Sequence, residues 1–160
     1  MHVAESRSAT WSLSVTLVAV GGFLAAMGVL LGWWDVEGYR ESEIFGRELV
    51  LEDTLAGTAS WTGVLALVAG LVVGVLAIVS LLVGSDGLQR VLPVAATAGG
   101  LVILASAALG MVQTNEVARA SVDAGELSVE GSAAIGLLLS AAGGALVALG
   151  GLVARRQRAV

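Results

Sequence analysis

Four long stretches without an ionisable residue divide the sequence, at 8–34, 54–85, 91–115 and 131–154. Trimmed at residues typical of a membrane interface, they predict helices at about 11–33, 61–83, 91–111 and 133–154. Each is close to the ~20 residues that a helix needs to cross ~30 Å of hydrocarbon. The pattern therefore predicts an all-α membrane protein, in which residues 1–160 form one domain, a bundle of four transmembrane helices.

Two longer polar segments, 35–60 and 112–130, connect the spans on one side of the membrane, and a short turn, 84–90, connects them on the other. The first contains the run EIFGRELVL at 43–51, whose β-branched and aromatic residues around Gly46 suit a short hairpin. Residues 126–130 alternate between polar and apolar and predict a strand that pairs with the first loop. We therefore expect a small outer β-sheet, and Ser132 as the N-cap of the fourth helix.

Arginines are shared unequally between the two sides. The side that holds both termini carries five arginines and two acidic residues, whereas the other side carries three arginines and eleven acidic residues. Because arginine-rich short loops stay in the cytoplasm, we predict a multi-pass protein of the cell membrane with both termini cytoplasmic. Tryptophan is enriched at membrane interfaces, which predicts four interfacial anchors: Trp11 on the inner side and Trp33, Trp34 and Trp61 on the outer side.

Small residues recur every three or four positions along the spans. Such stripes let helix backbones approach each other in lipid, where little hydrophobic force holds helices together. Two interpretations stay open: packing among the chain's own helices, which we favour, or contact with another membrane protein. The predicted packing positions are Gly21, Ala25, Gly28 and Gly32 in the first span, Gly70 and Gly74 in the second, and Gly136, Ser140 and Gly144 in the fourth.

Composition narrows the possible chemistry. The hydrophobic share is 57%, with 22 glycines in addition, and only 13% of residues are charged. The chain has no cysteine, which excludes disulfides, thiolate catalysis and cysteine-bound metal centres. No ionisable residue lies inside a predicted span, so a proton relay or a charged selectivity filter lacks its usual groups. A net charge of −5 argues against binding to nucleic acid.

We accordingly expect no enzyme activity and no cofactor. The single histidine, His2, cannot form a metal site alone. Carboxylates in the first outer loop could bind a divalent cation through their oxygens, but we interpret them as a solvated acidic surface.

An apolar group interrupts the acidic first loop and forms a possible contact surface. It comprises Ile44, Phe45, Leu49, Val50 and Leu51. Such side chains gain nothing from exposure to water, so they either pack on the second outer loop, which we favour, or remain exposed for a partner.

The layout resembles that of small four-span actinobacterial proteins. It combines a first helix that ends in tryptophans, the outer-loop run IFGREL at 44–49, an Ala/Gly/Val/Leu-rich second helix, a short turn with an arginine, and a fourth helix that ends at Arg155 and Arg156. Among these it is similar to the tryptophan-associated transmembrane protein family, whose function is unassigned. The order of spans also resembles claudin-like proteins. Their outer loop carries a tryptophan with a cysteine pair, which this chain lacks, so that resemblance concerns architecture alone. Neither resemblance implies a catalytic residue.

These features predict a non-enzymatic membrane accessory, scaffold or assembly subunit. It would contact the lipid bilayer and either a membrane-protein partner or a second copy, through its helix-packing faces and its acidic outer cap. The alternative is an oligomeric channel or small-molecule permease, with a pore lined by hydroxyls such as those of Thr97 and Ser106. A third hypothesis is a membrane enzyme that uses outer-loop carboxylates such as Glu48 and Glu52.

Overall fold

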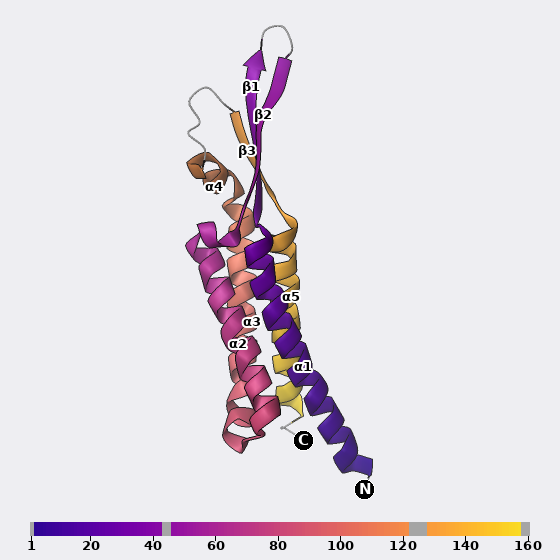
Figure 1. Ribbon diagram of the computed structural model, residues 1–160. Helices are drawn as coiled ribbons and strands as arrows, with labels where there is room; N and C mark the ends of the chain where they lie inside the picture. Colours follow the sequence, from indigo (N-terminus) through magenta and orange to yellow (C-terminus); the bar gives the residue numbers. More distant parts are fainter. Residues whose placement is uncertain (1, 43–45, 122–127, 158–160) are drawn as a thin grey trace.

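The computed structural model describes residues 2–42, 46–121 and 128–157 and shows a bundle of four long helices beneath a small β-sheet (Figure 1). The long helices are α1 (His2–Leu31), α2 (Trp61–Val83), α3 (Asp86–Val112) and α5 (Ile135–Arg156). Each is long and apolar enough to cross a membrane, α1 through its part Trp11–Leu31. The predicted fold class, an all-α bundle of four spans with a small sheet, is confirmed.

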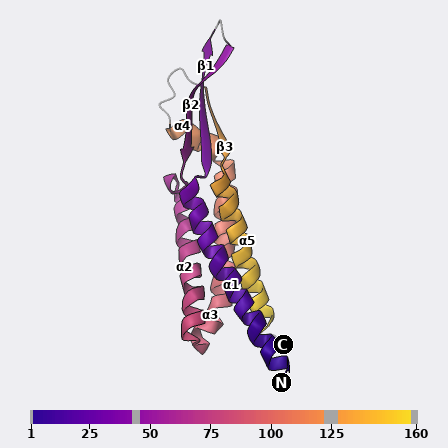
Figure 2. The same cartoon turned by 45° about the vertical axis from the view of Figure 1, so that its right-hand side comes forward.

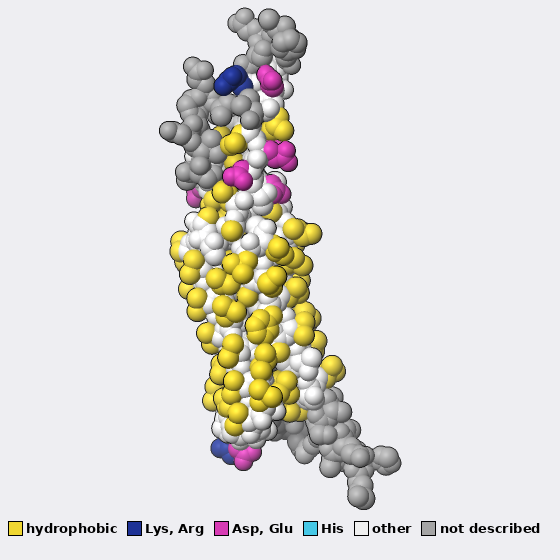
Figure 3. Space-filling view, viewed as in Figure 1, with side chains coloured by type: hydrophobic (Ala, Val, Ile, Leu, Met, Phe, Trp, Pro, Cys, Tyr) yellow, Lys and Arg dark blue, Asp and Glu magenta, His cyan; other side chains and the backbone are white. Residues whose placement is uncertain are grey.

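The four long helices form a closed ring in which α1 packs on α2, α2 on α3, α3 on α5 and α5 on α1 (Figures 1 and 2). The core has two clusters of buried side chains, one near the sheet around Val29, Ile103 and Leu137, and one farther down around Val18 and Val147. The start of α1 and the end of α5 lie at the end of the bundle away from the sheet. Large apolar side chains cover much of the outer surface of the bundle (Figure 3).

The turn between α2 and α3 is shorter than the sequence suggests. Gly84 ends α2 in the left-handed conformation, with φ of 63°, and its N–H donates to the Ser80 carbonyl. The side chain of Ser85 then accepts a hydrogen bond from the Leu88 N–H and caps α3, which begins at Asp86 rather than near residue 91. The sequence placed the start of α3 too late because its first turn is polar. A helix N-terminus favours an acidic side chain there, so these polar residues belong to the helix.

Within the described residues the outer sheet has three antiparallel strands, β1 (Trp34–Ser42), β2 (Gly46–Leu55) and β3 (Ser128–Ala133), in the order β2-β1-β3. A 3-10 turn, η1 (Gly57–Ala59), connects β2 to α2, and a short helix, α4 (Thr114–Ser121), follows α3 and lies against β3 and β1. The predicted pairing of the two outer loops is thus confirmed. The N-cap prediction is wrong, since Ser132 pairs with Asp35 in the sheet and Ala134 precedes α5 without a side-chain cap.

Adjacent glycines in α1 serve two different helix contacts. A Cβ atom added to Gly21 would lie 2.7 Å from the Gly143 carbonyl oxygen of α5. One added to Gly22 would lie 2.6 Å from the Gly70 carbonyl oxygen of α2. Both distances are shorter than a carbon and an oxygen tolerate, so a larger residue at either position would push the helices apart.

All nine predicted packing positions are buried and face other parts of the same chain. Gly28 lies against Gly136 and Ser140, and Gly144 lies against Ile103. Among the other positions, Gly32 lies against Thr54 and Gly136, Ala25 against Ser140, Gly70 against Gly22, and Gly74 against Phe23. The stripes therefore hold the bundle together and leave none of these positions on its outer surface.

Candidate functional site

Trp33 and Trp34 lie inside the top of the bundle, which corrects the interfacial anchor role predicted for them. Both side chains are 0% exposed, and their rings meet edge to face with centroids 5.6 Å apart. The cause is the backbone at Gly32, whose φ of 120° turns the chain from α1 into β1 and directs both indoles inward. Trp61 is 63% exposed at the start of α2 and Trp11 is half-buried, so the anchor role stays a prediction for these two.

Each buried indole has a hydrogen-bond acceptor on another helix. Trp33 Nε1 donates to Ser140 Oγ of α5 at 3.1 Å, and Ser140 Oγ donates in turn to the Ala25 carbonyl of α1 at 3.0 Å. Trp34 Nε1 donates to the Gly110 carbonyl in the last turn of α3 at 2.9 Å. Carbonyls in the last turn of a helix have no partner within the helix, so this indole also caps α3. We call Trp33, Trp34, Ser140 and Gly110 the tryptophan junction.

The tryptophan junction also ties the sheet to the bundle through backbone contacts. The Trp33 N–H donates to the Leu55 carbonyl at the end of β2, and the Trp33 carbonyl accepts from the Ala134 N–H before α5. The indole of Trp33 is held between two glycines. A Cβ atom added to Gly57 would lie 2.8 Å from this ring, and one added to Gly110 would lie 3.0 Å from it. The base of the sheet is therefore rigidly attached to α1, α3 and α5.

Carboxylates from all three strands share one face of the sheet above the tryptophan junction. Glu37 of β1 pairs with Glu52 of β2 on one side and with Glu130 of β3 on the other. Directly paired residues of antiparallel strands project on the same face, a few ångströms apart. Asp35 lies on that face as well, between Thr54 and Ser132, and Thr54 Oγ1 donates to Asp35 Oδ1 at 2.9 Å. We call the face that carries Asp35, Glu37, Glu52 and Glu130 the acidic face.

Arg47 reaches across the acidic face from β2 to β3. Its Nη2 atom lies 2.6 Å from Glu130 Oε1, and its guanidinium carbon lies 3.9 Å from the centre of the Tyr39 ring. The Tyr39 hydroxyl donates to Glu37, and this hydrogen bond, together with partial burial, raises the pKa of Tyr39. Since Arg47 and Glu130 are 47% and 61% exposed, water screens the ion pair, which contributes about 0–1 kcal/mol to stability.

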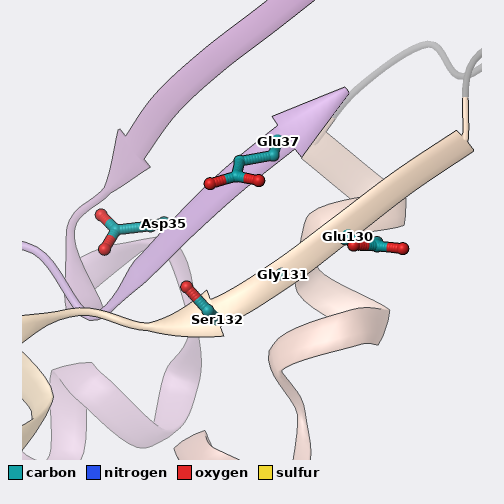
Figure 4. A pocket seen from close by; sticks show the side chains of 5 residues that line it. All are labelled: Asp35, Glu37, Glu130, Gly131 and Ser132. Atoms are coloured by element: carbon teal, nitrogen blue, oxygen red, sulfur yellow. The ribbon is translucent and has the colours of Figure 1, made fainter. Parts of the chain in front are cut away.

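A shallow hollow of about 120 Å³ lies on the acidic face, lined by Asp35, Glu37, Glu130, Gly131 and Ser132 (Figure 4). A water molecule takes up ~30 Å³ of liquid, so the hollow has room for a few waters or for the end of one cationic side chain. Within residues 2–42, 46–121 and 128–157, no three acidic or histidine side chains are arranged to hold a metal ion. The hollow is a polar depression without a formed coordination site.

Two of the five side chains in the predicted apolar contact group, Leu49 and Leu51, can be placed. Ile44 and Phe45 lie outside the described residues. Leu49 is 48% exposed, whereas Leu51 is half-buried and pairs with Gly38. Val129 pairs with Gly38 from the other side, so the missing side chain of this glycine leaves space between Leu51 and Val129. Leu51 is therefore partly covered within the sheet, Leu49 is in solvent, and packing on the second outer loop stays a prediction.

The sequence alone did not identify the partners within the site. It marked Trp33, Trp34 and Ser140 singly but neither indole hydrogen bond, and it did not mark Tyr39. The only tyrosine of the chain, beside an arginine and several acidic residues in one loop, was the available signal for the Tyr39 contacts.

No protein-family model matches the chain, and comparison with curated proteins gives no significant match. What the protein does must therefore be inferred from its own residues and their geometry.

Proposed function

We propose that this protein is a non-enzymatic membrane subunit that presents the acidic face of its outer sheet to another membrane protein. The observation that carries the proposal is a charged surface held on a rigid base. The three strands contain seven acidic residues and two arginines, and the tryptophan junction fixes them on the bundle. A preformed surface loses little conformational entropy when a partner binds.

The packing of the bundle supports contact through the sheet rather than through the glycine stripes. The nine packing positions face the chain's own residues, so they are not available to another helix without rearrangement. The outer surface of α2 instead carries exposed apolar residues such as Leu71 and Val72, which suit lipid chains. Acidic side chains gather on the sheet (Figure 3), where an oppositely charged partner would be attracted.

The distribution of charge supports a cytoplasmic location of the termini and an external location of the sheet. Arg90, Arg155 and Arg156 lie at the end of the bundle opposite the sheet. Arginines close to the ends of spans favour the cytoplasmic side. In this orientation the acidic face lies outside the cell membrane and is accessible to a partner there.

The alternative function, a channel formed by several copies, receives less support. The hydroxyls proposed to line its pore lie against the chain's own helices: Thr97 Oγ1 donates to the Pro93 carbonyl, and Ser106 is 4% exposed. A pore between copies would need polar side chains on the outer surface of the helices, where the described residues are mostly apolar.

Photo-crosslinking in native membranes tests the proposal. A benzophenone amino acid replaces Glu52 on the acidic face or, as a matched control, Leu71 on the outer surface of α2; both positions are exposed. We expect a protein adduct of one defined mass from position 52, identified by mass spectrometry, and lipid adducts alone from position 71. Adducts of position 52 only with copies of this chain, together with ion flux through the purified protein in liposomes, would favour the channel instead.

A further inference from the structure

The outer edge of β2 is available for pairing with another strand. In the sheet order β2-β1-β3, β2 pairs with β1 on one side, and no described strand lies on its other side. In Figures 1 and 2 the hairpin of β1 and β2 rises beyond the bundle, and among the strands α4 packs mainly on β3. A free strand edge presents backbone N–H and C=O groups that can pair with an extended segment of another chain.

An irregularity in the pairing limits the usable part of this edge. Gly38 pairs with Leu51 and Tyr39 with Leu49, so the backbone of residue 50 has no direct partner in β1. Such a bulge disrupts the ladder and increases the local twist. The regular run Leu51–Leu55 lies between this bulge and the tryptophan junction, which holds Leu55 through the Trp33 N–H. These five residues are therefore the regularly paired, firmly held part of the edge, next to the bundle.

Charges along this part of the edge select among possible occupants. Glu52 projects on the acidic face, and Asp53, the next residue, leaves the strand on the opposite face, because side chains alternate along a strand. One oxygen of Asp53, Oδ1, accepts from the Thr54 N–H at 2.8 Å, and the other oxygen has no hydrogen-bond partner among the described residues of this run. Both residues are exposed. A second copy that paired through the same run would place these carboxylates near their equivalents, and like charges opposite each other are destabilising. A strand with lysine or arginine on both faces would meet opposite charge on each.

We propose that an extended basic segment of a membrane-protein partner adds to β2 as a fourth strand, opposite Leu51–Leu55. This inference rests on the proposed function and specifies the mode of binding: backbone pairing supplies the register, and Glu52 and Asp53 supply the selection for basic side chains. The partner segment lies just above the membrane, because the paired run is the part of β2 nearest the bundle.

Peptide binding to the full chain in nanodiscs of phosphatidylcholine tests the inference. The probe is a twelve-residue peptide of valine, threonine and paired lysines, and the control has the same charge but prolines in place of two valines. Fluorescence anisotropy measures affinity, and hydrogen–deuterium exchange locates the protected amides. We expect the lysine peptide alone to bind and to slow exchange at 51–55 but not at 128–133.

Charge variants of the protein provide the second measurement. Glu52→Lys combined with Asp53→Lys should weaken binding of the lysine peptide about tenfold or more, because two attractions become repulsions. Glu116→Lys, an exposed charge reversal at a single position on α4, is the control and should have little effect. Unchanged exchange rates in α1 and α5 verify that the variants are folded. If the double lysine variant is not folded, the variant with Glu52→Gln and Asp53→Asn takes its place.

Three results would overturn the inference. The first is no binding of the lysine peptide, and the second is equal binding of the proline peptide, which cannot form the backbone ladder. The third is protection at β3 in place of β2. If any of these occurs while position 52 still crosslinks to a partner, the proposed function stands and only the edge pairing fails. The absence of that crosslink contradicts the proposed function itself.

Discussion

Ser140 links three separate parts of the chain through one hydroxyl. Its Oγ accepts from Trp33 Nε1 and donates to the Ala25 carbonyl, and its side chain is 0% exposed. In this dry environment no water can replace the hydroxyl if it is removed, so the indole N–H would remain unpaired. The free-energy cost of an unsatisfied buried donor exceeds the modest net value of the hydrogen bond itself.

We expect Ser140→Ala to lower the free energy of unfolding by ~1–3 kcal/mol, the cost of leaving a buried donor unpaired. Ser132→Ala, at an exposed serine of β3, is the control and should change it by less than ~0.5 kcal/mol. Unfolding in mild detergent, followed by tryptophan fluorescence, measures both. A Ser140→Ala protein as stable as the unsubstituted protein would mean that the indole finds another acceptor.

Tyr39 offers a second test at the scale of one residue. The hydrogen bond to Glu37 raises its pKa above the ordinary value of about 10. Because the folded-state pKa is the higher one, this contact stabilises the fold fully below pH ~10, and the contribution is lost as pH rises through the folded-state pKa.

Since Tyr39 is the only tyrosine, absorbance of tyrosinate near 295 nm reports its ionisation directly. We expect a midpoint above 10 in the folded protein and a lower midpoint in Glu37→Gln, which removes the charged acceptor. Glu116→Gln, on α4, should leave the midpoint unchanged. Equal midpoints in the unsubstituted protein and Glu37→Gln would show that the hydroxyl does not donate to Glu37 in solution.

Two positions of one helix contact differ in how strictly they require glycine. At the contact of α1 with α2, a Cβ atom on Gly70 would lie 2.7 Å from the Gly22 carbonyl oxygen, which belongs to the backbone. A Cβ atom on Gly74 would lie 3.3 Å from the ring of Phe23, a side chain that is 38% exposed. A side chain at the bundle surface can move aside, but a helix backbone moves only with its helix.

Gly70→Leu and Gly74→Leu should therefore both destabilise the bundle, with the larger effect at Gly70. Overpacking typically costs ~1–3 kcal/mol, and we expect Gly70→Leu at the upper end of that range. Leu71→Ile, at an exposed neighbouring position, is the control and should be nearly silent. Thermal stability in detergent ranks the three variants. The reverse order for the two glycines would mean that α1 and α2 pack differently.

The two ends of the molecule carry opposite charge: carboxylates lie on the sheet at one end, and arginines lie near the other end. Four apolar helices separate the two ends, so the molecule suits a membrane with different charge on its two sides. The tryptophan junction makes the sheet a continuation of the bundle instead of a flexible appendage. A contact made outside the membrane is thereby positioned relative to the helices.

The orientation can be tested cleanly because the chain contains no cysteine. We expect Glu52→Cys to react with a membrane-impermeant maleimide in intact cells, and Gly87→Cys to react only after the membrane is permeabilised. Both positions are exposed, and a Cβ atom on Gly87 meets no other atom within 4 Å. Reporter fusions at Val160 should read cytoplasmic. An external reading there, or labelling of Gly87→Cys in intact cells, would invert the topology.

The sequence by itself determined the four spans, the side on which both termini lie relative to the sheet, and the two loops that build it. These properties depend on local sequence: the length of an apolar run determines a span, and alternation of polar and apolar residues in 126–130 indicates a strand. The same local signals misplaced the start of α3, because its first turn is polar, and the N-cap of α5, because Ser132 is needed in the sheet.

Only the tertiary structure decided what the tryptophans and carboxylates do. A tryptophan at the end of a span is typical of an interfacial anchor, but Trp33 and Trp34 are buried. Their indoles donate hydrogen bonds to acceptors 107 and 76 positions away in the sequence, which no local pattern reveals. Likewise, the row of Glu52, Glu37 and Glu130 exists only in the register of three paired strands. Whether a side chain faces the core or the solvent depends on backbone turns such as that at Gly32 and on partners far away in the sequence. Neither can be recognised from local hydropathy.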